Sequence, residues 1–528
     1  MNLYPIIQNL NYSTQTFLVK FVIISLIILA WSVLKNKNNI TSTFRKIKKQ
    51  TWIILVIIII LGLSLKIVLP EHHHRMYVDE PWTLEKAKDI LKSDFPNNKF
   101  YPEPIGWSFI VSGVFVLFGL NNWIAIYFTT FIGSLITVNI FLLSYLLFKS
   151  EKAALISAGI FILEPLTMLW SASSYALVPS VFLITFSMIC LLLYLKYKDD
   201  KTFILAAASL FFSMQFRGEN YALLIFVGLV LIWNFFQENN LNITKKQIII
   251  FILLGILVIP NLFEVSSFYF TDKLAIDDTH GQVDKTWSFQ RIFSEEKINV
   301  VKEFMFQNSY YPIAINILFF AGIILSFRKF KFQNYFLLSW FFIFIIIFSA
   351  FFVFRKRFFL IVMPVIFLYA GYAISRIIDD ISQKKLGQIS PKTINVTIMI
   401  IIILSFLPYL MDLPKNSFWI DSKLESKVPE MLEKDIKLMN VECVIVMQSP
   451  TIMRATTELE VISTRDFCQG NYQTESDCLL FYEGLFPDKT LRGSSCINQK
   501  RYYSLSDFLT YTVKKGEETR EYFVKKIN

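Results

Sequence analysis

The chain has 528 residues, of which 54% are hydrophobic and 53 are Phe, and its mean hydropathy is +0.49. This composition excludes a water-soluble globular domain and indicates a polytopic helical membrane protein that has the lipid bilayer as a partner. Lys and Arg outnumber Asp and Glu by 52 to 41, which gives a net charge of +11. We attribute this excess to loops under the positive-inside rule, and we expect no nucleic acid as a partner.

The first two apolar runs set the predicted orientation. No Lys or Arg precedes the run at 17–34, whereas the loop that follows it is strongly basic. A secretory signal carries its positive charge in front of its apolar run, so we interpret this run as an uncleaved helix whose N-terminus lies outside. The next run, at 51–69, returns the chain to the outer side.

An outer loop at 71–121 follows, of which the part at 71–104 is polar, and we expect the loop to lie outside. It presents Asp79 and Glu80 side by side and later reads Tyr101-Pro102-Glu103-Pro104. Adjacent carboxylates beside a membrane suggest acid–base chemistry or cation binding, and a solvated connector is the alternative. A divalent metal is a possible cofactor, and its candidate ligands in this segment and in a later outer loop are His72, His73, His74, Asp277, Asp278 and His280.

The short apolar stretch at 105–119 decides the sidedness of the rest of the chain. If it crossed the bilayer, the basic loops at 196–201, 328–331 and 384–385 would all lie outside. We therefore interpret it as a juxtamembrane helix along the interface.

Twelve membrane-spanning helices result, with both termini outside. We predict them at 17–34, 51–69, 123–148, 153–170, 177–195, 203–216, 221–236, 248–265, 310–327, 335–354, 358–378 and 394–411. One basic cluster, Arg355-Lys356-Arg357, then falls on the outer side, against the rule. Positive charge at that place is what a site for an anion requires.

The composition changes at the boundary between 411 and 412. Residues 1–411 form the predicted multi-spanning domain, and 412–528 are more polar, with strand patterns at 444–447, 461–463, 479–482 and 522–526. We expect a small α/β domain outside the membrane. It holds Cys443, Cys468, Cys478 and Cys496, which favours two disulfides with three possible connectivities over a zinc site.

Several short motifs follow one another along the chain. They are Asp79-Glu80, the aromatic-proline stretch, a short apolar helix ending Phe118-Gly119, Glu164-Pro165-Leu166, Arg217-Gly218-Glu219, and Arg357-Phe358-Phe359 with Pro364. In order and sidedness they resemble the GT-C membrane glycosyltransferases, in the superfamily of protein O-mannosyltransferases and lipid A aminoarabinose transferases. The likeness covers most of 51–378. Many relatives carry a second acidic residue on the outer loop at 170–179, which here has no Asp or Glu.

The resemblance implies transfer of a sugar from a polyprenyl phosphate, outside the cytoplasm, to a protein, lipid or glycan. The acceptor hydroxyl loses a proton as it attacks the anomeric carbon, so we assign Asp79 as general base, with Glu80 orienting it or binding the acceptor. Arg357 can hold the lipid phosphate through a forked contact, with Lys356 or Arg355 assisting. An interfacial arginine that binds lipid headgroups is the alternative.

Four further residues are candidates for the site. Arg217 and Glu219 lie at a predicted outer helix end, where a structural ion pair is the favoured interpretation. Glu164 lies within an apolar span and is therefore functional by default, or it pairs with Arg217. Tyr101 belongs to the outer segment that carries Asp79.

Two other classes of function stay open. A secondary transporter would account for Glu164 and for the number of helices, but such proteins show paired, interrupted spans in two related halves, and none is found. A non-catalytic scaffold that presents the tail domain would leave the Asp79-Glu80 pair and the outer arginines unexplained.

Overall fold

The computed structural model describes residues 4–70, 80–92, 103–238, 244–262, 294–306, 311–350, 356–383 and 391–412, and five strands between 443 and 527. The chain divides into two compact units, which are described separately. One comprises Met1–His72 with Asp89–Lys415, and the other His73–Lys88 with Asn416–Asn528.

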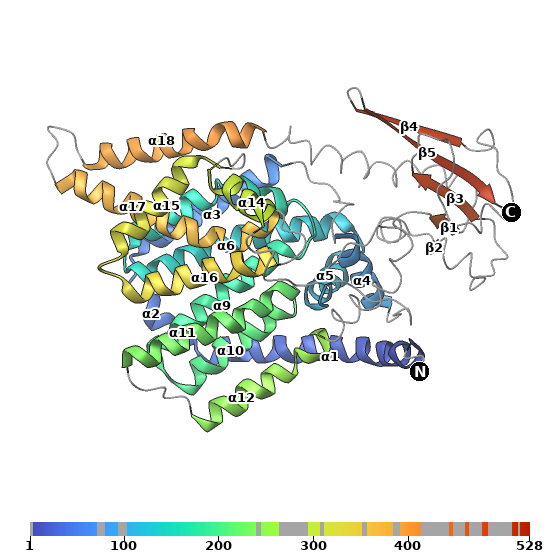
Figure 1. The fold of residues 1–528 in the computed structure, drawn as a ribbon, viewed down its shortest axis with the longest axis horizontal. Helices are drawn as coiled ribbons and strands as arrows, with labels where there is room; N and C mark the ends of the chain where they lie inside the picture. Colours follow the sequence, from blue (N-terminus) through green and yellow to red (C-terminus); the bar gives the residue numbers. More distant parts are fainter. Residues whose placement is uncertain are drawn as a thin grey trace. The chain divides into compact units, whose positions relative to one another are not determined.

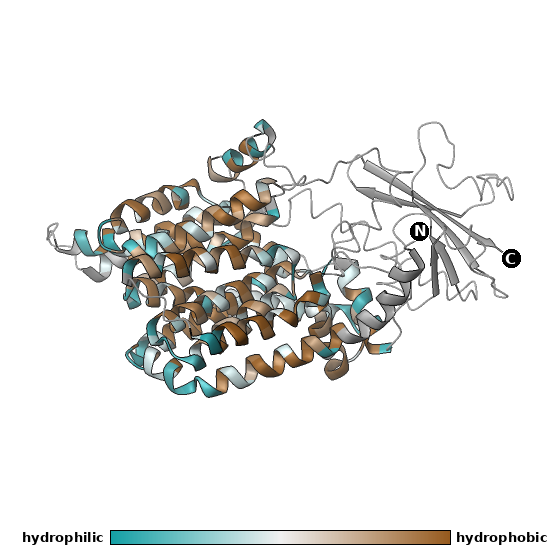
Figure 2. Ribbon diagram, turned by 60° about the horizontal axis from the view of Figure 1, so that its bottom comes forward, coloured by the Kyte–Doolittle hydropathy of each residue, from teal (hydrophilic) through white to brown (hydrophobic). Residues whose placement is uncertain are grey.

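The first unit is a bundle of apolar helices (Figure 1). Six of the described helices are long and apolar enough to cross a membrane. They are α1 (Tyr4–Lys35), α3 (Lys49–Val68), α6 (Asn122–Phe148), α9 (Leu177–Tyr197), α11 (Ala222–Glu238) with the preceding η1 (Gly218–Tyr221), and α16 (Lys331–Ala350). Apolar residues cover most of their length in Figure 2, and the chain is a multi-pass membrane protein.

A seventh span is broken. The helices α7 (Glu151–Phe161) and α8 (Pro165–Ser171) pass the same test only together, and they meet at an angle of 59°. The break has a local cause, because Pro165 occupies the first turn of α8 and Glu164 caps it. The Glu164 carboxylate accepts hydrogen bonds from the backbone amides of Leu166 and Thr167, at 2.7 and 2.5 Å.

Three helices that overlap predicted spans are shorter than a membrane crossing requires. The helices α10 (Asp200–Met214), α12 (Lys245–Ile256) and α15 (Ile313–Ser326) have 15, 12 and 14 residues, against about 20 needed to cross a bilayer. The remaining helices are α2 (Lys37–Phe44), α4 (Glu80–Lys92), α5 (Gly106–Phe118), α14 (Glu295–Phe306), η3 (Lys356–Ile361), α17 (Met363–Gln383) and α18 (Pro391–Asp412). A total of twelve spans therefore stays a prediction. At 13 residues, α5 is too short to span the bilayer alone, and its placement along the interface stays a prediction.

The core of the bundle lies around α17, which packs against both α7 and α15. Glycine permits both approaches. A side chain at Gly322 of α15 would collide with the backbone of Tyr369, and one at Gly371 of α17 would collide with Ser157 of α7. Small residues of this kind let helix backbones come close in a membrane.

The five strands form one mixed sheet in the order β2-β1-β3-β5-β4. They are β1 (Cys443–Val446), β2 (Glu460–Ser463), β3 (Cys478–Glu483), β4 (Leu509–Lys515) and β5 (Glu518–Ile527). The strand β1 runs parallel to β2 and β3, whereas β5 is antiparallel to β3 and β4. Each predicted strand overlaps one of these, and β4 was not predicted. The helices of an α/β domain would fall in the connections, outside the described residues, so that class stays a prediction.

Candidate functional site

The described structure covers only part of the predicted site. Glu80 begins α4 and Lys356 begins η3. Outside the described residues lie Asp79, Tyr101, Arg355, His72, His73, His74, Asp277, Asp278 and His280. The geometry is therefore built from Arg357, Arg217, Glu219 and Glu164.

Arg357 is half-buried among aromatic rings. Its guanidinium carbon lies 5.7 Å from the centre of the Trp170 ring and 5.4 Å from the centres of the Tyr175 and Phe358 rings. Trp170 belongs to α8, and Tyr175 follows in the turn before α9. The turn that carries no acidic residue thus supplies aromatic faces for the arginine, an arrangement favoured by cation–π attraction.

Arg217 is held by two carboxylates. Its Nη1 donates to Glu103 Oε1 at 2.7 Å, and its Nε and Nη2 donate to the two oxygens of Glu219 at 3.1 and 2.6 Å. The Arg217 side chain is only 4% exposed, so these charges interact with little screening by water. The predicted Arg217–Glu219 ion pair is present. Glu103 was missed, and its one signal in the sequence is its place between Pro102 and Pro104.

Both arginines share one ring. The guanidinium carbon of Arg217 lies 4.7 Å from the centre of the Tyr175 ring, and the positive charge of Arg357 attracts the Glu219 carboxylate. We refer to the six residues together as the arginine–aromatic cluster: Glu103, Trp170, Tyr175, Arg217, Glu219 and Arg357. Its two arginines and two glutamates bring three segments that are distant in sequence to one place.

The start of α5 and the end of α10 position this cluster. The amide of Gly106 donates to the Gln215 carbonyl at 2.8 Å, and a side chain at Gly106 would collide with that carbonyl. Trp107 Nε1 donates to the carbonyl of Ser174 at 2.7 Å, beside Tyr175. These contacts place Glu103, just before α5, within reach of Arg217.

Glu164 has a different partner from the one considered in the sequence. It caps α8 and interacts electrostatically with Lys66 of α3, whose Nζ donates to the Gly133 carbonyl of α6 at 2.7 Å. Both side chains are fully buried. A pair between Glu164 and Arg217 is therefore wrong, since Arg217 donates to Glu103 and Glu219. Lys66 was missed, although a Lys inside the apolar run at 51–69 was a visible signal.

Within the described residues, no group of three or more His, Cys, Asp or Glu side chains could hold a metal ion. The histidines and aspartates considered for that role lie outside those residues. A divalent metal stays a prediction.

The sequence matches no protein-family model and no curated protein. The fold does resemble solved structures. ArnT from Cupriavidus metallidurans in the apo state aligns with a TM-score of 0.57 and 12% identity, over 90% of this chain and 97% of that one. The same protein bound to undecaprenyl phosphate aligns with a TM-score of 0.55 and 13% identity, over 90% and 98%.

A second similar structure is that of the archaeal oligosaccharyltransferase AglB from Archaeoglobus fulgidus, in complex with an inhibitory peptide and a dolichol-phosphate. It aligns with a TM-score of 0.53 and 13% identity, over 80% of this chain. The chain spans 65% of the length of that protein. At these identities the likeness concerns the fold, and the fold is that of the GT-C membrane glycosyltransferases, as the order of motifs in the sequence predicted.

Proposed function

We propose that this protein is a glycosyltransferase that moves a sugar from a polyprenyl phosphate to a protein, lipid or glycan acceptor. The observation that carries the proposal is Arg357, a cation half-buried between Trp170 and Tyr175 within a GT-C fold. Two similar structures support it, because one holds undecaprenyl phosphate and the other a dolichol-phosphate.

Arg357 is the proposed ligand of the donor phosphate. A guanidinium offers two parallel N–H donors to a phosphate, and the rings around Arg357 shield part of it from water, which strengthens a charge-assisted contact. Lys356 and Arg355 precede it in the chain and would add positive charge. Because the leaving group is a phosphate ester anion, such charge also stabilises the bond as it breaks.

Asp79 is the proposed general base, with Glu80 as the group that orients it or binds the acceptor. The acceptor hydroxyl gives its proton to Asp79 while its oxygen forms the new bond to the anomeric carbon. The bond from that carbon to the phosphate oxygen breaks, and the lipid phosphate leaves. The assignment of Asp79 as general base rests on the chemistry of this transfer and on the resemblance of the sequence to the GT-C membrane glycosyltransferases.

Glu103 and Glu219 are proposed as positioning residues. Relatives place a second acid on the loop at 170–179, and here these two carboxylates reach Tyr175 of that loop through Arg217. By holding Arg217 they keep the Tyr175 ring in place, on which Arg357 also stacks.

We further propose that the chain has twelve membrane spans, that its active site is extracytoplasmic, and that the tail forms an extracytoplasmic α/β domain.

The test is transfer by the purified full chain, in detergent, from a panel of polyprenyl-phosphate sugars. We expect Asp79→Asn to lower turnover by roughly 10²–10⁴ with donor affinity nearly unchanged, because only proton acceptance is lost. Arg357→Ala removes a charged contact worth about 1.5–3 kcal/mol, so donor affinity should fall roughly 10- to 150-fold.

The matched control is Arg328→Ala, an exposed arginine at the opposite end of α16. It should leave both quantities unchanged. Loss of donor binding in Asp79→Asn together with normal binding in Arg357→Ala would reverse the two roles. If both variants transfer sugar at the wild-type rate, the active site lies elsewhere.

A further inference from the structure

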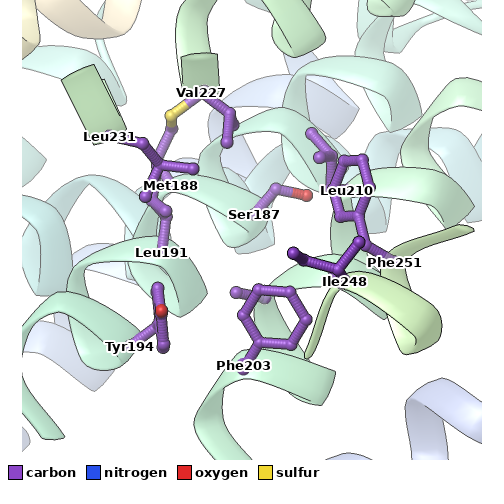
Figure 3. Close-up of a pocket in the computed structure, with 12 residues that line it drawn as sticks. Ser187, Met188, Leu191, Tyr194, Phe203, Leu210, Val227, Leu231, Ile248 and Phe251 are labelled. Carbon is purple, nitrogen blue, oxygen red and sulfur yellow. The ribbon is translucent and has the colours of Figure 1, made fainter. Parts of the chain in front are cut away.

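A cavity of about 180 Å³ lies between α9, α10, α11 and α12 (Figure 3). Its wall is almost entirely apolar. Residues at helical spacing on each helix face it, such as Met188 and Leu191 of α9 and Phe203 and Leu210 of α10. We call it the α9–α12 pocket.

The pocket exists because its helices are attached to different neighbours. Trp233 of α11 stacks on Tyr335 of α16 with ring centres 4.3 Å apart, whereas Phe251 of α12 contacts Phe211 of α10 at 4.8 Å. Three of the lining side chains are small, those of Ser187, Ala206 and Ala207. Among the described residues, no bulky side chain therefore fills the space between α11 and α12.

The pocket reaches the lipid-facing surface. Ile248 of α12 lines it and is 50% exposed. On the outer faces of the same helices, Ile225 and Ile252 are 55% and 57% exposed. An apolar cavity of this kind does not hold ordered water, since water needs polar partners. Hydrocarbon from the bilayer is the matching occupant.

One end of the pocket is polar and basic. Tyr194, in its wall, donates to Gln247 at 3.4 Å, and both Gln247 and Lys246 donate to Asp200 at 2.9 Å. The segments at 196–201 and 245–246 join this end. They hold five Lys and two Asp, a net charge of +3. Basic residues beside an apolar surface attract anionic headgroups.

We propose that the α9–α12 pocket binds one acyl chain of an anionic glycerophospholipid, whose headgroup lies against the lysines at 196–201 and 245–246. The tail of the sugar donor is the less suitable occupant. Its phosphate is assigned to Arg357, beside the Tyr175 end of α9, whereas the pocket begins at Ser187, about 15 Å farther along that helix. The lysines lie at the opposite end, so one phosphate cannot satisfy both places.

The experiment is native mass spectrometry of the full chain titrated with phosphatidylglycerol or phosphatidylcholine of the same chain length. The wild type should retain one phosphatidylglycerol with at least about tenfold preference over phosphatidylcholine. Ala207→Phe fills the pocket and should abolish the retained lipid. Lys201→Ser with Lys245→Ser, at exposed positions, should remove most of the preference. Leu253→Phe is the control, because Leu253 is 58% exposed on the side of α12 away from Ile248 and Phe251, and this variant should bind as the wild type does.

The double lysine variant tests the proposal even if Ala207→Phe fails to fold, because exposed lysines do not contribute to the core. Equal binding of the two phospholipids by the wild type, or full retention in Ala207→Phe, would overturn the proposal. A third titration uses undecaprenyl phosphate. If it displaces phosphatidylglycerol from the wild type and binds Ala207→Phe more weakly, the pocket belongs to the donor tail instead. Sugar transfer is not part of the readout, so failure here leaves the proposed activity untouched.

Discussion

The ion pairs of this protein differ mainly in how much water reaches them. Arg217 lies between Glu103 and Glu219 with side chains 4%, 13% and 17% exposed, whereas the side chains of Lys246 and Asp200 are 68% and 35% exposed. Water screens the second pair and stabilises its separated charges. Loss of one partner should therefore matter only in the first.

Arg217→Met should lower the free energy of unfolding by about 3–5 kcal/mol, because two largely buried carboxylates lose their shared, buried cation. Lys246→Ala is the matched control and should cost no more than about 1 kcal/mol. Chemical unfolding of both variants in detergent measures the difference. Equal losses of unfolding free energy would show that water reaches Arg217, Glu103 and Glu219 as it reaches the exposed pair, and that their ion pairs do not stabilise the fold.

Among the elements, α8 links the pair of Glu164 and Lys66 to the arginine–aromatic cluster. Glu164 caps its start near Lys66, and Trp170 near its end contacts Arg357. Its close approach to α6 depends on Gly133, where a side chain would collide with Ser171. The angle of this short helix therefore decides where the aromatic faces of the cluster lie.

Lys66→Met should destabilise the protein, since the Glu164 carboxylate then lacks its electrostatic partner. Glu164→Gln in the same chain should recover part of that loss, with an interaction free energy of about 0.5–3 kcal/mol. A double-mutant cycle on unfolding in detergent measures it. Pairing Lys66→Met with Glu151→Gln, at the other end of α7, should give additive losses. Additivity in both cycles would rule out the coupling.

The sheet narrows the possible cysteine pairings. Cys443 of β1 and Cys478 of β3 are register partners in neighbouring parallel strands. Neighbouring strands are about 4.8 Å apart, and a disulfide joins Cα atoms roughly 4.4–6.8 Å apart. We therefore predict a bond between Cys443 and Cys478, which leaves Cys468 to pair with Cys496. Non-reducing peptide mapping should recover these two linked pairs. Four free thiols, another connectivity or bound zinc would contradict the prediction.

At the scale of the whole molecule, two loops predicted to share one side of the membrane do lie together. Asn36 Nδ2 donates to the carbonyl of Lys201 at 2.8 Å, and Lys196 Nζ donates to Thr43 at 2.9 Å. The basic segments at 35–49 and 196–201 thus gather at the same end of the bundle. The positive-inside rule predicts that this end faces the cytoplasm, and the labelling of introduced cysteines tests that prediction.

A cysteine introduced at Asn38, an exposed position of α2, should resist an impermeant thiol reagent in intact cells. A cysteine at Ser422, in the tail, should react. Labelling is measured above that of the unmodified chain, and permeabilised cells should label both positions. Equal labelling in intact cells would overturn the orientation and the interface placement of the stretch at 105–119.

The sequence by itself determined that the chain is a multi-pass membrane protein and where most of its helices and strands lie, whereas the residues it assigns to the site stay predictions. Long apolar runs dictate membrane helices because lipid offers the backbone no hydrogen-bond partner, and alternation marks strands because their side chains repeat every two residues. The Arg217–Glu219 ion pair could also be predicted from the sequence, because its two members are only two residues apart and chain connectivity keeps them close.

Only the tertiary structure decided which distant groups meet. Arg217 and Glu103 are 114 residues apart in sequence, and Arg357 reaches Trp170 and Tyr175 from another part of the chain. Such contacts depend on where a helix breaks and how closely two helices pack, as at the bend before α8 and at Gly133. No local pattern encodes these distances, because they follow from the packing of all the helices together.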